Sequence, residues 1–341
     1  MQPINILFTT VSNGHSIIPL FREALGKHGK IFMSNSIMTG AFLQADGYTI
    51  SPPIYDDSYI DFLINYCLAN NITAILSWIE IDLPVLAKNK ERFRENGITV
   101  IVSDEPVIRL CNDKWKTHLF LASLGLPQPK TYIDLDLFKH DIQNGKISFP
   151  VIVKPRWGIS SEGLYQINSA EELDVLYQKS YKNNYRHYVK YLSNIEPNPN
   201  AIVIIQEKIG GQEYGLDVFN DLNGNYVVTI PKTKTEMRLG ATCTSIVQQN
   251  VTLEQTGKTI SQNLKHIANI GVDCFLTPSG EAVVIEINPR FAVHYAFSQL
   301  AGANFPAQII EWLAGNPTSE KYITFKTGVK GYIDFHLPIR V

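Results

Sequence analysis

The sequence has little cysteine and no large excess of charge of either sign. Its 341 residues include four cysteines, widely separated, with neither a Cys-x-x-Cys pair nor a Cys/His run. That pattern excludes a disulfide framework and argues against a zinc site. A formal net charge of −2 lacks the basic excess that non-specific nucleic-acid binding requires. We therefore expect reduced thiols and no nucleic-acid partner.

Long apolar runs are also missing. No run reaches the roughly 18 apolar residues of a transmembrane helix, and residues 1–5 lack the charged and apolar regions of a signal peptide. These absences predict a cytoplasmic protein with no membrane partner. An apolar content of 45% in a chain of this length is enough for two or three domains or subdomains.

Strands and helices alternate in the first third of the chain. Such alternation predicts βαβ units and a doubly wound parallel sheet over residues 1–105. A turn at Asn13-Gly14-His15 is either a simple connection or an anion site, and it lacks the Gly-x-Gly-x-x-Gly pattern of a nicotinamide site. The predicted strands are 4–10, 31–35, 74–77 and 98–102, and the predicted helices begin near 17 and span 61–70 and 83–96.

The remainder of the chain has a mixed α+β pattern. Residues 156–163 form a predicted loop, and the tyrosine- and lysine-rich stretch 177–200 is either a solvated segment or a substrate-contacting insert. The predicted strands are 151–154, 201–208, 214–219, 226–231, 272–276 and 282–287, and the predicted helices are 114–124, 256–270 and 307–313.

The last two of these strands predict a hairpin with acids on one face. A turn centred between Ser279 and Gly280 places Asp273 directly opposite Glu286. Side chains alternate along a strand, so Glu286 and Asn288 face one side while Ile285 and Ile287 face the other. Opposed carboxylates repel unless a cation lies between them, and oxygen ligands suit Mg²⁺. The hairpin is therefore either a metal site or an acidic exposed face.

Residues 284–290, VIEINPR, resemble the metal-binding strand of ATP-grasp enzymes, especially those similar to the large subunit of carbamoyl-phosphate synthetase. Further motifs follow in the same order as in that family: residues 112–114 (NDK), 125–129 (GLPQP), 150–155 (PVIVKP) and 206–209 (QEKI). The resemblance covers most of the chain. It implies a pre-ATP-grasp domain at 1–105, an N-terminal ATP-grasp subdomain with a phosphate lid at 106–200, and a C-terminal subdomain with the metal site at 201–341.

The resemblance also assigns nucleotide contacts. Lys114 and Lys154 would place positive charge on the ATP phosphates, and backbone amides of the lid would close over them, since glycine permits close approach. Ile159 stands where the family often has glycine. Glu207 and the backbone of Ile209 would contact adenine, and Glu213 the ribose. The lid residues named are Gly158, Ser160, Ser161 and Gly163.

The remaining implied roles concern metal and transferred phosphate. Asp273, Glu286 and Asn288 would hold Mg²⁺ or Mn²⁺, although the family more often has glutamine or glutamate at the first position. Arg290 and Arg238 are the candidate catalytic cations, because the planar guanidinium binds phosphate with two hydrogen bonds. Lys232 and His294 are weaker candidates, for which we expect structural roles.

The function that the resemblance implies is ligation of a small-molecule carboxylate to an amine. ATP would phosphorylate the carboxylate, and the amine would attack the acyl phosphate; such chemistry needs positioning and charge neutralisation rather than a protein nucleophile. The alternatives are a carboxyphosphate- or carbamate-forming relative of carbamoyl-phosphate synthetase and a non-catalytic ATP-binding module. Members of the family are commonly dimers, so a homodimer is expected.

Overall fold

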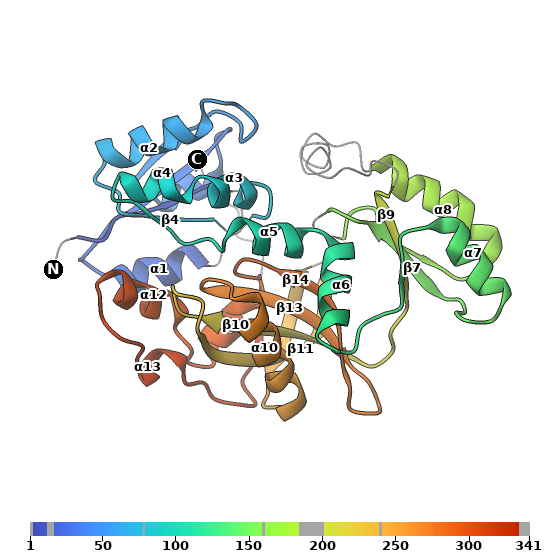
Figure 1. The fold of residues 1–341 in the computed structure, drawn as a ribbon. Coiled ribbons are helices and arrows are strands. Elements are labelled where there is room, and N and C mark those ends of the chain that lie inside the picture. The colour runs from blue at the N-terminus through green and yellow to red at the C-terminus, as the bar shows by residue number, and fades with distance from the viewer. Residues whose placement is uncertain are drawn as a thin grey trace.

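The computed structural model describes residues 3–11, 17–77, 79–158, 161–183, 201–238 and 241–333. The predicted turn at residues 13–15 and most of the stretch 177–200 lie outside the described residues. In the part described, the chain forms three sheets, each with its own helices (Figure 1). No helix within these ranges is long and apolar enough to span a membrane.

The first sheet confirms the predicted parallel α/β unit. Its strand order is β3-β2-β1-β4-β5, and every neighbouring pair is parallel. The strands are β1 (Ile6–Phe8), β2 (Ile31–Asn35), β3 (Gly47–Ile50), β4 (Ala74–Leu76) and β5 (Thr99–Val100). The helical segments are α1 (Ile17–Leu25), η1 (Gly40–Gln44), α2 (Tyr59–Ala69), α3 (Leu83–Lys88) and α4 (Lys90–Glu95).

The second sheet is small and antiparallel, in the order β6-β9-β7-β8. Figure 1 shows it with α7 and α8 at the right of the molecule, away from the first sheet. It contains β6 (Thr131–Tyr132), β7 (Val151–Pro155), β8 (Tyr165–Ile167), β9 (Val203–Glu207), α7 (Leu135–Gln143) and α8 (Ala170–Asn183). It is connected to the first unit through α5 (Glu105–Asn112) and α6 (Lys114–Ser123).

The third sheet is the largest, in the order β14-β13-β10-β11-β12-β15. Its strands are β10 (Gln212–Asn220), β11 (Tyr226–Arg238), β12 (Ala241–Val247), β13 (Asn269–Leu276), β14 (Ala282–Asn288) and β15 (Lys330–Tyr332). The helices are α10 (Val251–Leu264), α11 (Tyr295–Leu300), α12 (Phe305–Leu313) and α13 (Glu320–Ile323).

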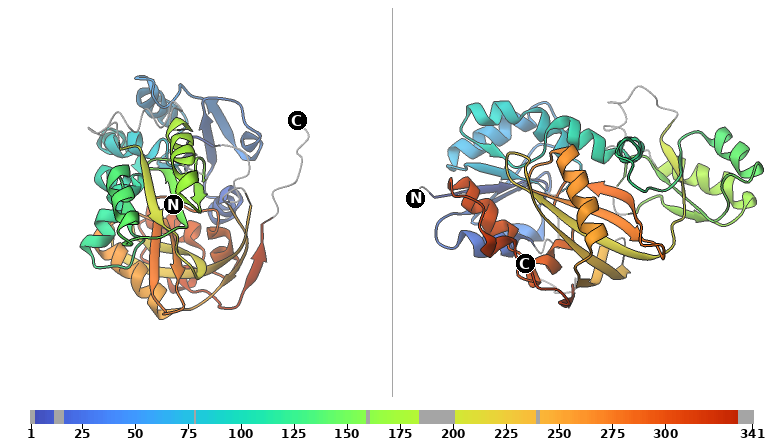
Figure 2. Two further views of the ribbon diagram at one scale, coloured as in Figure 1. Left: turned by 90° about the vertical axis from the view of Figure 1, so that its right-hand side faces the viewer. Right: turned by 60° about the horizontal axis from the view of Figure 1, so that its bottom comes forward.

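Helix α10 covers one face of the third sheet, as the view from below shows (Figure 2). Leu253 and Ile260 of α10 are buried in one core with Leu216, Val272 and Ile287. Because side chains alternate along a strand, the intervening residues of β10 and β13 face the opposite side. That opposite side carries the polar residues of the candidate site.

The first and third units share a core. Phe21 of α1 packs with Phe291, whose ring centroid lies 6.2 Å away, and α1 lies beside α12 (Figure 1). Phe219 of β10 stacks on Phe305 of α12 at 3.8 Å between centroids. This shared apolar cluster fixes the first unit against the sheet that carries the acidic hairpin.

Two predicted helices were wrong in extent. The helix expected at 256–270 is α10, which ends at Leu264 before Lys265 takes a left-handed conformation, φ 56°. Asn250 begins it instead, because its side chain accepts a hydrogen bond from the Leu253 amide at 3.0 Å. The helix expected at 83–96 is broken at Asn89 into α3 and α4. Strands β3, β6, β8, β12 and β15 were not predicted.

Candidate functional site

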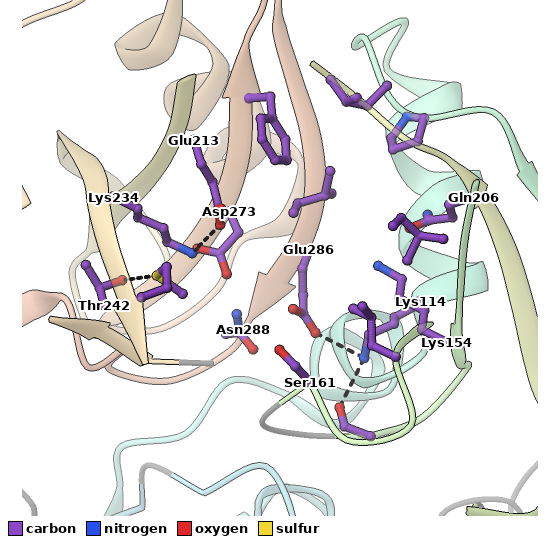
Figure 3. A pocket seen from close by; sticks show the side chains of 18 of the residues that line it. Lys114, Lys154, Ser161, Gln206, Glu213, Lys234, Thr242, Asp273, Glu286 and Asn288 are labelled. Atoms are coloured by element: carbon purple, nitrogen blue, oxygen red, sulfur yellow. Dashed lines mark hydrogen bonds and ion pairs between the residues drawn. The ribbon is translucent and has the colours of Figure 1, made fainter. Parts of the chain in front are cut away.

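A cavity of about 810 Å³ lies between the second and third sheets, within the size range of small-molecule sites. Figure 3 shows side chains from both sheets converging on it. Residues from all three units line it: Glu80, Lys114, Ile152, Lys154, Gly158, Ser161, Gln206, Glu207, Lys208, Ile209, Gly210, Gly211, Glu213, Lys234, Met237, Thr242, Asp273, Phe275, Ile285, Glu286, Asn288, Arg290 and His294.

Lys114 is fixed at one end of this cavity by local structure. It begins α6, and Asp113 caps that helix by accepting hydrogen bonds from the amides of Trp115 and Lys116. The buried Arg156 holds the Asp113 carboxylate in turn, with a 2.6 Å ion pair. Lys114 Nζ donates to the Gly158 carbonyl at 3.0 Å. The predicted lysine is therefore held against the start of the predicted lid.

Lys154 lies on β7 beside Lys114 (Figure 3). It is 7% exposed, and burial lowers its pKa to about 8, with Lys114 lowering it and Glu286 raising it. The two lysines concentrate positive charge where the hairpin carboxylates meet the second sheet. Such a cluster can neutralise phosphate oxygens.

Glu286 faces these lysines from β14. Its Oε1 lies 3.0 Å from Lys114 Nζ. Burial alone would raise its pKa, but Lys114 and Lys154 outweigh that effect and lower the pKa to about 2. The carboxylate is therefore ionised throughout the physiological range. A charged oxygen donor at this position is available to a divalent cation.

Asp273 lies directly opposite Glu286 across the hairpin, as predicted. Its cation partner is Lys234, which sequence reasoning missed: Lys234 Nζ is 2.7 Å from Asp273 Oδ1 and 2.9 Å from Glu213 Oε1. Burial lowers the pKa of Lys234, but Asp273 and Glu213 outweigh it and raise the pKa. Lysines thus form ion pairs with both opposed carboxylates.

The hairpin differs from the prediction at Ile285. Asp273 pairs with Glu286, yet Cys274 pairs with Val284, so a bulge leaves Ile285 as an extra residue. We expected Ile285 on the core face with Ile287; that prediction was wrong, because Ile285 lines the cavity while Ile287 is buried in the core. A bulge breaks alternation and turns two consecutive side chains to one face.

The oxygen donors of the predicted metal site are Asp273, Glu286 and Asn288, and all line the cavity. Within the described ranges, no group of three or more His, Cys, Asp or Glu side chains is positioned to hold a metal. The donor set has two carboxylates and an amide, a chemistry that fits Mg²⁺. Their role as metal ligands stays a prediction.

The end of β9 and the residues that follow it line the cavity with residues 206–211. Glu207 is anchored at the sheet edge: its amide donates to the Lys130 carbonyl at 2.9 Å, and its carboxylate accepts from the Lys130 amide at 3.2 Å. Ile209 follows where strand pairing has ended. This is the place predicted for adenine, and Glu213 lies one strand further on.

Only some of the other predicted site residues line the cavity. Gly158 and Ser161 line the cavity, whereas Gly163 is not among its lining residues. Ser160 lies outside the described residues. Arg238 is exposed, pairs with Glu236 at 2.9 Å and is not part of the described cavity lining. The structure therefore does not bring Arg238 to the other predicted groups.

Arg290 does line the cavity, and its partner is Glu80 from the first unit. Arg290 Nη2 and Glu80 Oε1 are 2.5 Å apart. Glu80 follows β4 and is a second residue that sequence reasoning missed. Nothing local in the sequence marks it, since its partner is 210 positions away.

Lys232 and His294 belong to a buried network under the hairpin. Lys232 is completely buried and pairs with Asp217 at 2.6 Å. His294 places Nδ1 3.4 Å from Asp217 and Nε2 3.8 Å from Asp273. The negative charge of Asp217 makes burial of Lys232 possible. Lys232 is therefore a buried structural residue, whereas His294 also lines the cavity.

Comparison with known proteins finds two family models that match successive parts of the chain. A family model described as "ATP-grasp domain" matches residues 147–298, and one described as "PylC-like, N-terminal domain" matches residues 6–101. The carbamoyl-phosphate synthase of Methanobrevibacter smithii is 27% identical over 264 residues, which cover 73% of this chain and 65% of that protein. The large chain from Thermoanaerobacter sp. is 27% identical over 212 residues, 58% of this chain and 18% of that protein.

Solved structures share the fold across nearly the whole chain. The L-amino acid ligase from Bacillus licheniformis has a TM-score of 0.73 at 17% identity. The match covers 100% of this chain and 82% of the ligase chain. The biotin carboxylase domain of Hydrogenobacter thermophilus 2-oxoglutarate carboxylase, solved with MgADP, ADP and bicarbonate, has a TM-score of 0.72 at 18% identity. It covers 95% of this chain and 73% of its own.

Residues 147–298 thus match the ATP-grasp domain model, and the solved structures share the three-sheet fold. The first unit matches the PylC-like N-terminal domain model, and the relatives by sequence include carbamoyl-phosphate synthases. The chain spans less than two thirds of the length of those relatives.

Proposed function

We propose that this protein is an ATP- and Mg²⁺-dependent ligase that activates a small-molecule carboxylate for attack by an amine. One observation carries the proposal: Lys114 and Lys154 gather around Glu286 in a cavity that Asp273 and residues 206–211 also line. This arrangement suits a nucleotide with its triphosphate at the lysines. The match of residues 147–298 to the ATP-grasp domain model supports the same interpretation.

In the proposed reaction, a carboxylate oxygen of the substrate attacks the γ-phosphorus of ATP, and ADP leaves. The amine nitrogen then attacks the acyl carbon, inorganic phosphate leaves, and the amine loses a proton. Lys114 and Lys154 bind the phosphates, and Arg290 neutralises charge on the transferred group. Asp273, Glu286 and Asn288 would hold Mg²⁺ or Mn²⁺, which would neutralise further phosphate charge. The adenine would contact Glu207 and Ile209, the ribose Glu213.

The residues after β7 have a protective role in this proposal. Gly158 and Ser161 lie at the lysine end of the cavity, and their backbone amides, with those of Ser160 and Gly163, would close over the phosphates. Closure excludes water and so prevents hydrolysis of the acyl phosphate. Arg238 would have to move to take part, because it lies apart from the described cavity lining.

A second candidate function is phosphorylation of bicarbonate to carboxyphosphate. It is favoured by the sequence relationship to carbamoyl-phosphate synthases and by the fold shared with a biotin carboxylase domain solved with bicarbonate. A non-catalytic nucleotide-binding module is the third, and the paired acids Asp273 and Glu286 weigh against it. A cytoplasmic homodimer completes the proposal; light scattering after gel filtration tests the dimer.

Purified protein incubated with ATP, Mg²⁺ and a panel of carboxylates, each with and without amines, tests the proposal by release of ADP and phosphate. Release that requires both substrates supports the ligase. Release that requires only bicarbonate supports the second candidate. ATP binding without turnover on every panel member contradicts both.

Glu286→Gln should lower turnover at least roughly 100-fold, since loss of a preorganised charge at reacting phosphates typically has that effect. Circular dichroism should remain unchanged. The matched control is Glu281→Gln, at the exposed turn of the same hairpin, which should retain full activity. Normal turnover in Glu286→Gln would disprove its assignment to the metal site.

A further inference from the structure

Glu80 extends from the first unit into the cavity that the other two units form. Its loop is fixed because the Glu80 carbonyl accepts a hydrogen bond from Asn112 Nδ2 at 3.2 Å. Its carboxylate lies 2.5 Å from the Arg290 guanidinium, and its side chain is 14% exposed. The pair thus lies at the lysine end of the cavity, close to Lys114 and Glu286.

The cavity carboxylates differ in their cation partners. Glu286 pairs with Lys114, while Asp273 and Glu213 share Lys234. Among the described residues, the ion partner found for Glu80 is Arg290 alone. In the proposed reaction Arg290 turns to the substrate carboxylate or the transferred phosphate. Glu80 would then be a largely buried carboxylate without a cation, which is strongly unfavourable.

A substrate that carries its own cation solves this problem. We propose that Glu80 binds the ammonium group of an α-amino acid whose carboxylate is held by Arg290 and then phosphorylated. Because the Glu80 and Arg290 groups are in direct contact, they match a zwitterion whose opposite charges are one carbon apart. A substrate whose ammonium and carboxylate groups are farther apart fits Glu80 and Arg290 less well. This inference rests on the proposed ligase function and names the class of its carboxylate substrate.

A merely positioning role for Glu80 makes a different prediction. If Glu80 only holds the Arg290 guanidinium in place, its loss weakens activation of every carboxylate to the same degree. If Glu80 binds the ammonium group, its loss weakens activation of amino acids and leaves their deamino analogues little affected. Pairs of substrates that differ only in the amino group therefore separate the two roles.

The experiment compares wild-type protein with Glu80→Gln on each of the common L-amino acids and on its deamino carboxylate, for example alanine with propionate. ATP, Mg²⁺ and hydroxylamine are present, since hydroxylamine attacks the acyl phosphate and gives a measurable hydroxamate and phosphate without the natural amine. We expect kcat/KM for the preferred amino acid to fall roughly 10- to 100-fold, as for loss of a buried charged hydrogen bond. The deamino analogue should change less than about threefold.

Two further variants serve as controls for Glu80→Gln. Glu95→Gln replaces an exposed glutamate of the same unit, on α4, and should behave as wild type. Glu80→Asp keeps the charge and should keep the preference for amino acids even if Glu80→Gln is poorly folded, which its thermal unfolding would reveal. Equal losses on both members of each pair, or no loss, would overturn the inference.

The outcome also separates this inference from the function on which it rests. Wild-type protein that activates deamino carboxylates but no amino acid overturns the role of Glu80 and leaves the ligase proposal standing. Protein that forms neither hydroxamate nor ADP with any carboxylate contradicts the ligase proposal itself.

Discussion

Lys154 shows how burial changes the pKa of a single side chain. Its ammonium group has little access to water, and the resulting desolvation lowers its pKa to about 8. Between pH 8 and its ordinary value of 10.5, the unfolded chain binds more protons than the folded chain. The contribution of Lys154 to stability therefore rises with pH in that window.

The same shift predicts the pH dependence of nucleotide binding. Affinity for ADP, measured calorimetrically with Mg²⁺ from pH 6.5 to 9.5, should fall roughly tenfold above pH 8, because Lys154 loses its charge. Lys154→Met should bind more weakly and remove this decline. Lys88→Met, at an exposed position of α3, is the control. A wild-type affinity that does not change across pH 8 would contradict the role of Lys154.

Single residues could be predicted from the sequence where a local motif marks them. Lys114 and Lys154 were named because residues 112–114 and 150–155 resemble motifs of ATP-grasp enzymes, and both line the cavity. Lys234 and Glu80 were missed, because each is defined by partners on other elements. In the sequence, nothing distinguishes Lys234 from other lysines in a polar strand. In the structure, β10 and β13 place Glu213 and Asp273 next to it.

At the level of elements, the acidic hairpin is the most informative feature. The pairing of Asp273 with Glu286 was predicted, but pairs nearer the turn, such as Cys274 with Val284, lie one position away from the predicted register. The bulge at Ile285 makes up that difference, and it was not predicted, since regular alternation allows no extra residue. Because of the bulge, an apolar side chain and a carboxylate enter the cavity side by side, one suited to contact an apolar ligand surface and one to bind a cation.

Substitution of two neighbouring isoleucines tests whether the bulge turns Ile285 into the cavity. Ile287→Ala should lower the free energy of unfolding by about 2–5 kcal/mol, since Ile287 is 1% exposed in the core. Ile285→Ala should lower it by less than about 1 kcal/mol and weaken ADP binding roughly three- to tenfold, because it removes apolar contact area in the cavity.

Urea unfolding and calorimetry measure the two effects, and each variant is the control for the other. Strong destabilisation by both variants, with unchanged ADP binding in Ile285→Ala, would show that strict alternation holds and that both isoleucines face the core.

At the scale of the whole molecule, the cavity exists only because three units meet. The second sheet contributes Lys154 and residues 206–211, the third contributes the hairpin acids, and the first contributes Glu80. A ligand that spans these contributions stabilises their arrangement by mass action. The shared apolar core between the first and third units holds Glu80 within reach of Arg290.

Nucleotide binding should therefore raise thermal stability. ADP with Mg²⁺ at one hundred times its dissociation constant should add about 2.7 kcal/mol, which raises the Tm by several degrees. Differential scanning calorimetry measures this shift, with Mg²⁺ alone as the control. An unchanged Tm at saturating nucleotide would contradict the proposed binding site.

The sequence by itself determined the parallel first sheet and the two strands of the acidic hairpin, because periodicity acts over short stretches of chain, whereas the charged residues of the site were named through motifs that resemble a known family. The tertiary structure alone decided which charges meet. Glu80 and Arg290 are 210 residues apart, and no local pattern encodes such a distance; only the packing of the first unit on the third sheet brings them into contact.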